Sequence, residues 1–212
     1  MFITVEGIEG CGKSTQIPLL AAYLESKGHR VVRTREPGGC PIADQIRTIL
    51  LDATNRTMVP MTELMLYAAS RAQHLADVVR PALADGAVVL CDRFSDATRA
   101  YQAFGRGIDR QTMEVLNSFA CDDLSPDMTL LLDCPVDIGL ARARRRIEAT
   151  EGPREERFEL ESMLFHQRVR DGYLQLSQEE PGRFVVIDAT GTPAEIAQRI
   201  AEVVTHRLGA VI

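Results

Sequence analysis

The sequence predicts an α/β protein built on a five-stranded parallel sheet with helices on both faces. Five short apolar runs alternate with stretches of helical periodicity along the chain, the pattern of strands joined by crossover helices. The first run leads into a glycine-rich turn, residues 7–14, that fits G-x-x-x-x-G-K-[ST]. A strand, this turn and a helix in succession are typical of the P-loop NTPase fold. With 212 residues, of which 45% are hydrophobic, the chain can bury one substantial core, and we expect a single domain over residues 1–212.

Composition and charge exclude several classes of protein. The formal net charge of −6 argues against the broad basic face of a nucleic-acid-binding protein, so we expect a small nucleotide partner and no nucleic acid. The five cysteines form no C-x-x-C pair, which predicts buried thiols in a reducing cytoplasm instead of disulfides or a zinc site. The chain shows no basic-then-apolar leader and no apolar run near the ~18 residues of a membrane span. We therefore expect a soluble cytoplasmic protein with no membrane partner.

The glycine-rich turn is a candidate polyphosphate site. Gly7, Gly10 and Gly12 lack a Cβ, so the backbone can adopt positive φ and turn N–H groups inward, beside the N-terminus of the next helix. We expect Lys13 to contact the β and γ phosphates of ATP and the Ser14 hydroxyl to complete the coordination of Mg²⁺. A chance glycine turn is the alternative, which the readable strand and helix on either side disfavour. The residues assigned to ATP binding are Gly7, Ile8, Glu9, Gly10, Cys11, Gly12, Lys13, Ser14 and Thr15.

The first half of the chain alternates helices with one further strand. Apolar side chains recur at helical spacing over residues 13–28, where a glycine ends the helix. A second strand is expected over residues 30–35 and is broken by E-P-G-G at 36–39, and a helix follows over 41–52. A proline then opens a long helix over about 60–84, which Asp-Gly terminates.

The second half supplies three more strands. Residues 87–91, 128–133 and 183–188 contain continuous apolar runs, as expected for strands covered on both faces. An amphipathic helix is expected over about 109–120 and a closing helix through 196–207. Four polar residues end strands and should meet at the carboxyl edge of the sheet, where such folds bind ligands. They are Glu6, Arg35, Asp92 and Asp133.

Residues 142–157 form an unusual charged segment between the fourth and fifth strands. The segment holds six Arg and four Glu, a net charge of +2, and Gly152-Pro153 offers a place to bend. Guanidinium groups beside a phosphate site suggest a lid that closes over a transferred phosphoryl group. The alternative is a solvated helix surface with i,i+4 Glu–Arg pairs, an interpretation that suits Arg144 to Arg146 in particular.

A P-loop alone leaves three classes of protein open: a small-molecule kinase, a GTPase-type switch, and a module that moves partners by ATP turnover. The switch needs D-x-x-G shortly after the P-loop and N-K-x-D for guanine. The only D-x-x-G lies at 188–191, after the last strand, and N-K-x-D is absent. A partner-moving ATPase is harder to exclude, but the lid and the acceptor-like loop favour a kinase.

The motifs beyond the P-loop resemble those of the bacterial thymidylate kinase (dTMP kinase) family. They are T-R-E-P-G-G at 34–39, D-R-F at 92–94, A-Y-Q at 100–102 and G-R-G at 105–107, in the family's order and spacing. The likeness spans almost the whole chain and is more specific than the P-loop alone. It implies a homodimeric nucleoside monophosphate kinase that transfers a phosphoryl group from MgATP to dTMP in dTTP synthesis, giving dTDP and ADP. Another P-loop nucleotide or deoxynucleoside kinase is the alternative.

The resemblance also implies which side chains hold the nucleoside of dTMP. On helical spacing alone, Tyr67, Arg71 and His74 share one face, which favours a partly buried ring beside an Arg that reaches solvent. The resemblance reverses that preference: it implies that Tyr67 stacks on or flanks the thymine and that Arg71 hydrogen-bonds its O4 edge. By similarity, Thr98 and Gln102 line the base pocket, and Tyr101 presses against the sugar where a ribose 2′-hydroxyl would lie.

The phosphate end of the site follows from the same resemblance. Arg93 is expected to grip the phosphate of dTMP with Arg35 beside it, which is chemically reasonable because the guanidinium fork suits phosphate oxygens. Asp92 is expected to orient Mg²⁺ together with Ser14. Glu9, inside the P-loop, is expected near the sugar 3′-hydroxyl or the metal.

A catalytic arginine is expected from the lid. In one branch of the family an Arg directly follows the acidic P-loop residue, but here Gly10 follows Glu9. We therefore expect a lid Arg to reach the γ-phosphoryl oxygens, and we choose Arg157 because E-R-F-E at 156–159 resembles the run that ends the lid in the other branch. Arg154 is the alternative. The expected catalytic residues are Lys13, Asp92, Arg93 and Arg157.

Overall fold

The computed structural model describes residues 1–149 and 157–209, and it confirms the predicted fold class. Five strands form one parallel sheet in the order β2-β3-β1-β4-β5. The central strands β1 and β4 are buried almost throughout, which agrees with their unbroken apolar runs. The bounds of the strands are β1 Phe2–Glu6, β2 Val31–Arg35, β3 Val88–Asp92, β4 Met128–Asp133 and β5 Phe184–Asp188.

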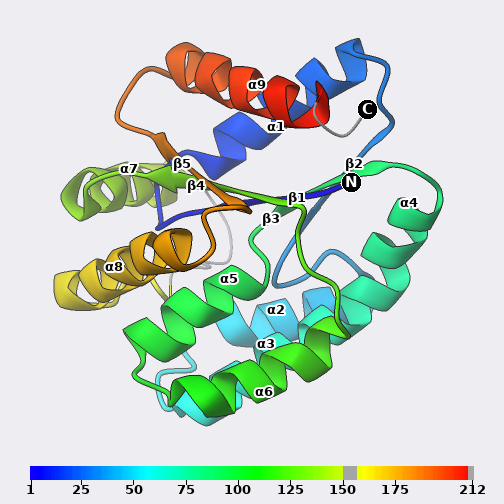
Figure 1. The fold of residues 1–212 in the computed structure, drawn as a ribbon. Helices are drawn as coiled ribbons and strands as arrows, with labels where there is room; N and C mark the ends of the chain where they lie inside the picture. The colour runs from blue at the N-terminus through cyan, green and yellow to red at the C-terminus, as the bar shows by residue number, and fades with distance from the viewer. Residues whose placement is uncertain (150–156, 210–212) are drawn as a thin grey trace.

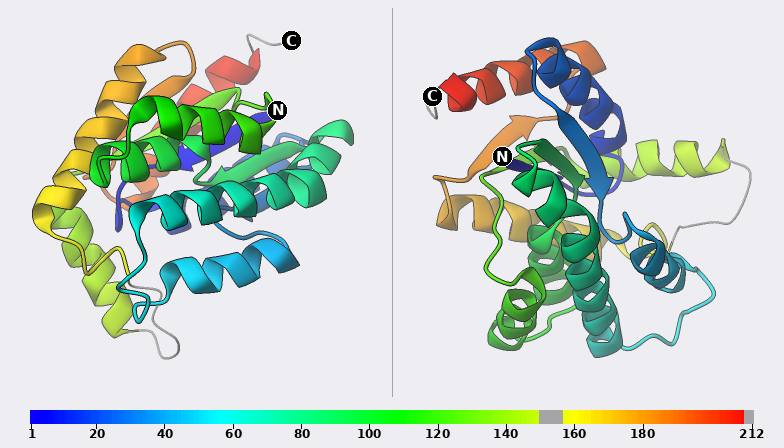
Figure 2. Two further views of the ribbon diagram at one scale, coloured as in Figure 1. Left: turned by 90° about the horizontal axis from the view of Figure 1, so that it is seen from below. Right: turned by 90° about the vertical axis from the view of Figure 1, so that its right-hand side faces the viewer.

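Helices cover both faces of the sheet (Figure 1). Helices α1 (Lys13–Ser26) and α9 (Pro193–Gly209) contact each other on one face. Helix α8 (Met163–Glu179) packs on the opposite face against β4 and β5. Below α8 in Figure 1 lies a layer of further helices that extends away from the sheet, as the right-hand view in Figure 2 also shows. This layer positions the acceptor half of the site described below.

The helix expected over about 60–84 is interrupted by a π-helical segment. Helix α3 spans Pro60–His74, η1 spans Leu75–Val79 and α4 spans Arg80–Ala84. The backbone N–H of Arg80 bonds to the carbonyl of Leu75, five residues earlier. Pro81 comes next and has no N–H to offer a carbonyl four residues back, which favours the wider turn at this place. Helix α2 (Pro41–Leu51) packs beside α3.

A second π-helical segment places the A-Y-Q motif. After the short helix α5 (Ser95–Thr98), the chain continues as η2 (Arg99–Gly105) and then turns into α6 (Arg110–Cys121). The Asp109 side chain caps α6 by accepting a hydrogen bond from the N–H of Thr112 at 2.9 Å. Tyr101 and Gln102 both lie in η2 and are both buried.

The charged segment predicted as a lid begins inside a helix. Helix α7 spans Val136–Glu148, and its Gly139 lies so close to the P-loop that a Cβ there would be 2.6 Å from the Glu9 carbonyl oxygen. The remainder of the predicted lid, residues 150–156 with Gly152-Pro153 and Arg154, lies outside the described residues. Helix α8 was not predicted from the sequence, although Ser162 caps it and Phe165, Val169 and Tyr173 recur at helical spacing on its buried side.

The cysteines agree with the sequence analysis. All five cysteines are buried with free thiols, as predicted. None of the helices within residues 1–149 and 157–209 is long and apolar enough to cross a membrane.

Candidate active site

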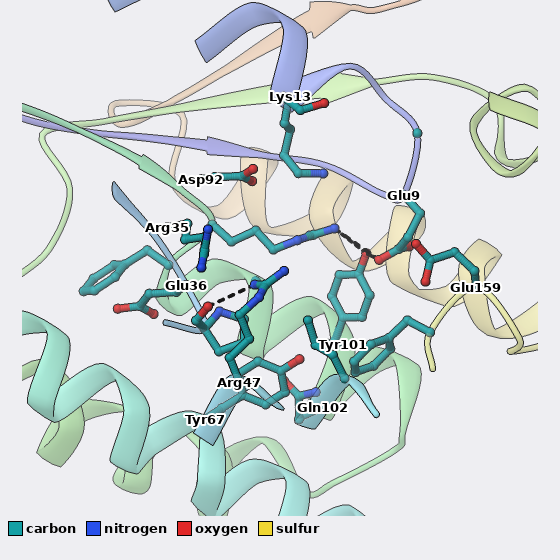
Figure 3. Close-up of a pocket in the computed structure, with 18 of the residues that line it drawn as sticks. Glu9, Lys13, Arg35, Glu36, Arg47, Tyr67, Asp92, Tyr101, Gln102 and Glu159 are labelled. Carbon is teal, nitrogen blue, oxygen red and sulfur yellow. Dashed lines mark hydrogen bonds and ion pairs between the residues drawn. The ribbon is translucent and has the colours of Figure 1, made fainter. Parts of the chain in front are cut away.

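The carboxyl ends of β1, β2 and β3 open into a cavity of about 480 Å³. Its upper end in Figure 3 is formed by the P-loop and Lys13, and its lower end by Tyr67 and Gln102. Between these ends lie Asp92 and Arg35. The strand-end residues Arg35 and Asp92 therefore meet as predicted, whereas Asp133 forms a paired contact with Arg170 of α8 at 2.8 and 2.9 Å.

Two glycines of the P-loop cannot be replaced without displacing backbone. Gly7 has φ 137°, and a Cβ there would lie 2.4 Å from the Leu132 carbonyl oxygen. Gly10 has φ 71°, and a Cβ there would lie 1.9 Å from the Gly139 carbonyl oxygen. Lys13 Nζ donates to the carbonyl oxygens of Gly7 and Ile8, each at 3.1 Å. The ammonium thus lies inside the loop, where a phosphate would replace those carbonyls.

Arg93 links the P-loop to the acceptor half of the cavity. It has φ 68°, an unusual backbone conformation for a residue other than glycine. Its Nη1 donates to Gly7 O at 2.9 Å and to the Tyr173 hydroxyl at 3.1 Å. Its Nη2 donates to Glu9 Oε1 at 3.1 Å and to the Tyr101 hydroxyl at 3.0 Å. The guanidinium is therefore fixed in place at the middle of the cavity.

Glu9 is an ionised carboxylate at the side of the cavity. Burial by itself would raise the pKa of the carboxyl, but the His166 side chain and the charges of Arg93 and Lys13 outweigh burial and lower the pKa to about 2. Tyr101 donates to Glu9 Oε1 at 2.6 Å. Figure 3 shows Glu9 beside Glu159. Burial of Glu159 raises the pKa of its carboxyl.

Arg71 forms the wall at the other end of the cavity and is only 1% exposed. Its Nε donates to Glu36 Oε2 at 2.8 Å, and its Nη1 donates to Asn117 Oδ1 at 2.5 Å. Its Nη2 donates to the Thr98 hydroxyl at 2.8 Å and to Phe94 O at 3.2 Å. A guanidinium has five N–H groups, so among the described residues one N–H on Nη1 has no protein acceptor and is left for a ligand.

The remaining residues predicted for the base differ in how they meet the cavity. Tyr67 lines it, and burial and the nearby Glu63 raise the pKa of its hydroxyl, which stays protonated. Gln102 lines it and donates from Nε2 to Glu63 Oε1 at 2.8 Å. Thr98 is buried behind Arg71 and does not line the cavity. Its contribution in this structure is the hydrogen bond that holds Arg71.

Comparison with known proteins identifies the family. The family model described as thymidylate kinase matches residues 5–200. A thymidylate kinase of Trichlorobacter lovleyi is 74% identical over 98% of both chains, and one of Geobacter sulfurreducens is 60% identical over 98% of this chain and 97% of that one. The chain belongs to the thymidylate kinase family. Its activity is accordingly the ATP-dependent phosphorylation of dTMP to dTDP. The crystal structure of thymidylate kinase from Ehrlichia chaffeensis has a TM-score of 0.77 and 32% identity, covering 96% of this chain and 98% of that one.

In this thymidylate kinase family member, the predicted catalytic Arg157 does not line the cavity. Its Nη2 lies 2.6 Å from Glu63 Oε2, and its Nε donates to Leu50 O at 2.5 Å. The side chain thus ties the segment before α8 to α2 and α3. Arg146 of α7 does line the cavity, with Nη2 3.3 Å from Glu159 Oε1. Arg154 lies outside the described residues.

Several side chains at the thymidylate kinase site were not predicted from the sequence. Arg47 of α2 lines the cavity and donates to Pro37 O at 3.0 Å, and Glu36 and Phe158 also line it. Glu63, only 1% exposed, accepts from Gln102 and Arg106 and forms an ion pair with Arg157. These residues come from elements far apart in the chain. Glu36 and Phe158 could have been found, because they lie inside the motifs at 34–39 and 156–159. Arg47 and Glu63 carry no such signal without the fold that brings them to the site.

Proposed function

We propose that ATP binds with its triphosphate on the P-loop and that dTMP binds between η2 and α3 in the same cavity. The observation that supports this arrangement is the cavity itself, which reaches from Lys13 and Ser14 to Tyr67 and Gln102. Its volume of about 480 Å³ lies within the range of small-molecule pockets, roughly 300–1,000 Å³. Phosphoryl transfer requires the two nucleotides to meet end to end, and a single elongated cavity satisfies that requirement.

Lys13 and the P-loop backbone would hold the donor phosphates. Gly7, Ile8, Glu9, Gly10, Cys11, Gly12, Ser14 and Thr15 form the rest of this cradle. Lys13 would exchange its contacts with the Gly7 and Ile8 carbonyls for phosphate oxygens. The exchange keeps the ammonium paired throughout and replaces two neutral carbonyls by charged oxygens, which form stronger hydrogen bonds.

Mg²⁺ would be held by Ser14 and Asp92 together with the phosphates. Both residues line the cavity, and the Asp92 Oδ1 atom is buried without a hydrogen-bond partner in the described part of the chain. No group of three or more His, Cys, Asp or Glu side chains within that part could hold a metal alone. This fits Mg²⁺, which keeps several waters and binds through one or two protein groups plus substrate phosphates. When bound, the ion would neutralise charge on the phosphates.

The acceptor would lie with its phosphate between Arg93 and Arg35 and its base at the far end. Arg93 is fixed by four hydrogen bonds through its two terminal nitrogens, so it would offer the attacking phosphate a rigidly placed charge and its Nε–H. Arg35 is exposed and ion-paired with Asp44 at 3.1 Å, so it can turn to the phosphate at little cost. Thymine would lie against Tyr67, with its O4 edge facing the free N–H of Arg71 and Gln102 alongside.

Tyr101 and Glu9 would form the surface under the sugar. The Tyr101 ring is held edge-on by Phe158, Phe165 and Tyr173, with centroids 5.4–6.2 Å apart. A ring packed on three sides cannot move away from an added hydroxyl group. This arrangement favours a deoxyribose over a ribose. Glu9 would then accept a hydrogen bond from the 3′-hydroxyl.

A lid arginine would complete the charge stabilisation of the transferred phosphoryl group. Arg157 is the first candidate because of its place in E-R-F-E, but it must leave Glu63 to act. Arg146 is a second candidate because its side chain already lines the cavity that Lys13 and Ser14 also line. The two candidates make different kinetic predictions, which are given in the Discussion.

The chain would assemble as a homodimer through α2, α3 and α6. These helices contact one another in that order, and each carries a pair of exposed apolar side chains at helical spacing. The pairs are Ile42 and Ile49, Met61 and Met65, and Val115 and Phe119, of which Phe119 is 81% exposed. An apolar stripe over three adjacent helices suits a self-complementary interface.

The protein would work in the cytoplasm. Free buried thiols are in keeping with that reducing compartment.

A coupled assay of ADP release tests the proposed substrates directly. The acceptors are dTMP, dUMP, AMP and CMP, with a reaction that lacks any acceptor as the control. We expect the highest kcat/KM with dTMP and no ADP release after Mg²⁺ is chelated. Equal rates with AMP, CMP or no acceptor would overturn the proposed acceptor site.

A further inference from the structure

A series of largely buried, hydrogen-bonded side chains runs from Arg71 through Glu36, which also lines the cavity, to His74 and Thr34 near the end of β2. Glu36 accepts from Arg71 Nε at 2.8 Å through Oε2 and lies 3.0 Å from His74 Nδ1 through Oε1. His74 Nε2 in turn lies 2.6 Å from the Thr34 hydroxyl. Arg71, His74 and Glu36 are at most 5% exposed. His74 belongs to no part of the reaction described above, although it shares a helix face with Tyr67 and Arg71.

The partners of His74 determine which nitrogen carries the hydrogen. A carboxylate oxygen can only accept, so His74 Nδ1 donates to Glu36. In the neutral ring, Nε2 then accepts from the Thr34 hydroxyl. Both ring nitrogens are therefore in use: Nδ1 donates to an acceptor, and Nε2 accepts from a donor. Rotation of the ring by half a turn about the Cβ–Cγ bond would break both hydrogen bonds.

The ring is also held by backbone. A Cβ on Gly39 would lie 2.7 Å from His74 Cδ2 and 2.6 Å from the Thr34 hydroxyl oxygen, so the loop after β2 passes directly over the ring. The same loop is tied to α3 by the hydrogen bond from Gly38 N to the Ser70 hydroxyl at 3.2 Å. His74 thus has no room to move, and through Glu36 it fixes the position of the Arg71 guanidinium.

We propose that His74 and Glu36 are positioning residues that set the base specificity of the acceptor site. This proposal rests on the proposed function, in which the free N–H of Arg71 meets the O4 edge of the base. Four N–H groups of Arg71 are held by Glu36, Asn117, Thr98 and Phe94. The direction of the fifth follows from those four. A guanidinium aimed in this way favours a 4-keto pyrimidine, since the 4-amino group of cytosine presents a donor where an acceptor is needed.

Two conservative substitutions of His74 separate positioning from simple filling of the core. In His74→Asn the side-chain amide nitrogen takes the place of Nδ1 and can still donate to Glu36. In His74→Gln the longer amide reaches the place of Nε2, so the contact with Thr34 is kept and the contact with Glu36 is lost. His206→Gln on α9, at an exposed position, is the matched control. Thr34→Val removes the hydroxyl that bonds to His74 without changing the shape of the side chain at position 34.

The measurements are KM and kcat for dTMP and for dCMP, KM for ATP, the Kd of dTMP by calorimetry, and Tm. We expect His74→Gln to raise the KM and Kd of dTMP about tenfold. The reason is that a misdirected Arg71 would lose its hydrogen bond to the base, and a hydrogen bond to a charged group contributes about that factor. The preference for dTMP over dCMP should fall with it, while the KM of ATP stays unchanged. His74→Asn and His206→Gln should remain within about threefold of wild type. Thr34→Val should give a smaller rise in the Kd of dTMP of about threefold.

The outcomes distinguish this inference from the proposed function. A wild-type enzyme that fails to prefer dTMP would overturn the proposed function itself. A wild type that prefers dTMP, with equal Kd values for the Asn and Gln variants, would overturn only the positioning role. If His74→Gln does not fold, an unchanged Kd in Thr34→Val overturns the inference, and a Kd raised for dTMP but not for ATP supports it.

Discussion

The Tyr101 hydroxyl lies 2.6 Å from Glu9 Oε1, so the acceptor half of the cavity is bonded directly to the P-loop. Arg93 donates to both groups through the same nitrogen. The three side chains form a closed triangle of hydrogen bonds. Each of them is placed by the other two, which makes the sugar end of the site rigid before any nucleotide binds.

Replacement of Tyr101 should relax discrimination between sugars. Tyr101→Ala removes the ring that would crowd a 2′-hydroxyl, so the preference for dTMP over its ribose analogue should narrow while the KM of ATP stays nearly unchanged. Tyr101→Phe keeps the ring and should keep the preference. Steady-state kinetics with the two acceptors measure the ratio of kcat/KM values. Tyr23→Phe on α1, where the hydroxyl contacts Thr205, serves as the control. A ratio unchanged in Tyr101→Ala would remove Tyr101 from the sugar site.

Removal of the P-loop ammonium should abolish most of the activity. Phosphoryl transfer depends on positioning and on charge stabilisation, so Lys13→Ala should lower kcat by roughly 10² to 10⁴, or about 3 to 5 kcal/mol in the transition state. The change should leave Tm nearly unaffected, because the hydrogen bonds of Lys13 to other described residues all go to two carbonyls and the Cys11 thiol of its own loop. Single-turnover kinetics with MgATP and dTMP provide the measurement. A mild effect on kcat would mean that this loop is not the donor site.

A buried carboxyl below the P-loop should make stability depend on pH. Burial and the nearby Asp96 charge raise the pKa of Glu6 from 4.5 to about 7. The unfolded chain therefore ionises Glu6 first, and the free energy of unfolding falls as pH rises from about 4.5 to about 7. The loss is on the order of 3 kcal/mol.

Glu6→Gln should remove this pH dependence. An amide can still accept from Phe94 N and bond to Tyr173, which lie 2.7 Å from the two Glu6 oxygens. The variant should match wild type at pH 4 and be more stable at pH 8, as measured by urea unfolding at both values. A wild type whose free energy of unfolding rises from pH 5 to pH 7, with the same rise in Glu6→Gln, would contradict the assignment.

The strands and the P-loop could be predicted from the sequence because their signals are local. A buried parallel strand is a continuous apolar run, and the P-loop glycines serve a turn only a few residues long. Helix α8 was missed although its signals are also local. Its first turn exposes two apolar side chains, Met163 and Leu164, and these obscure the helical spacing of the buried row Phe165, Val169 and Tyr173.

The choice of partner among charged residues could not be predicted. Spacing on α3 placed Arg71 and His74 on one face, but which carboxylate pairs with Arg71 depends on Glu36, which belongs to the loop after β2. In the same way, Arg157 has Glu63 within 2.6 Å, a residue more than ninety positions earlier in the chain. Long-range pairing of side chains is set by the fold and leaves no local pattern.

The oligomeric state should depend on the apolar face of α6. Phe119→Glu places a charge at the most exposed large apolar side chain of the proposed interface, and a charge buried against its own copy is strongly unfavourable. Light scattering after size exclusion should show a dimer for wild type and a monomer for the variant. Leu19→Glu on α1, also exposed, should remain dimeric. A monomeric wild type would exclude the proposed interface.

The lid arginine is decided by three alanine variants measured together. An arginine that reaches the transferred phosphoryl group contributes roughly 10³ to 10⁵ in kcat, or about 4 to 7 kcal/mol. Arg157→Ala should produce that loss in kcat with little change in the KM of dTMP if the chain rearranges to bring Arg157 from Glu63 to the P-loop. Arg146→Ala should produce it if the residue that already lines the cavity is the one used.

Arg144→Ala, at an exposed position on α7 and absent from the cavity wall, should do almost nothing. Arg157→Ala also removes an ion pair to a carboxylate that is only 1% exposed, so its Tm must be measured alongside. A lower Tm with unchanged kcat would assign Arg157 to structure alone, because a purely structural residue contributes equally to the ground state and the transition state. A kcat that collapses only in Arg144→Ala would refute both candidates.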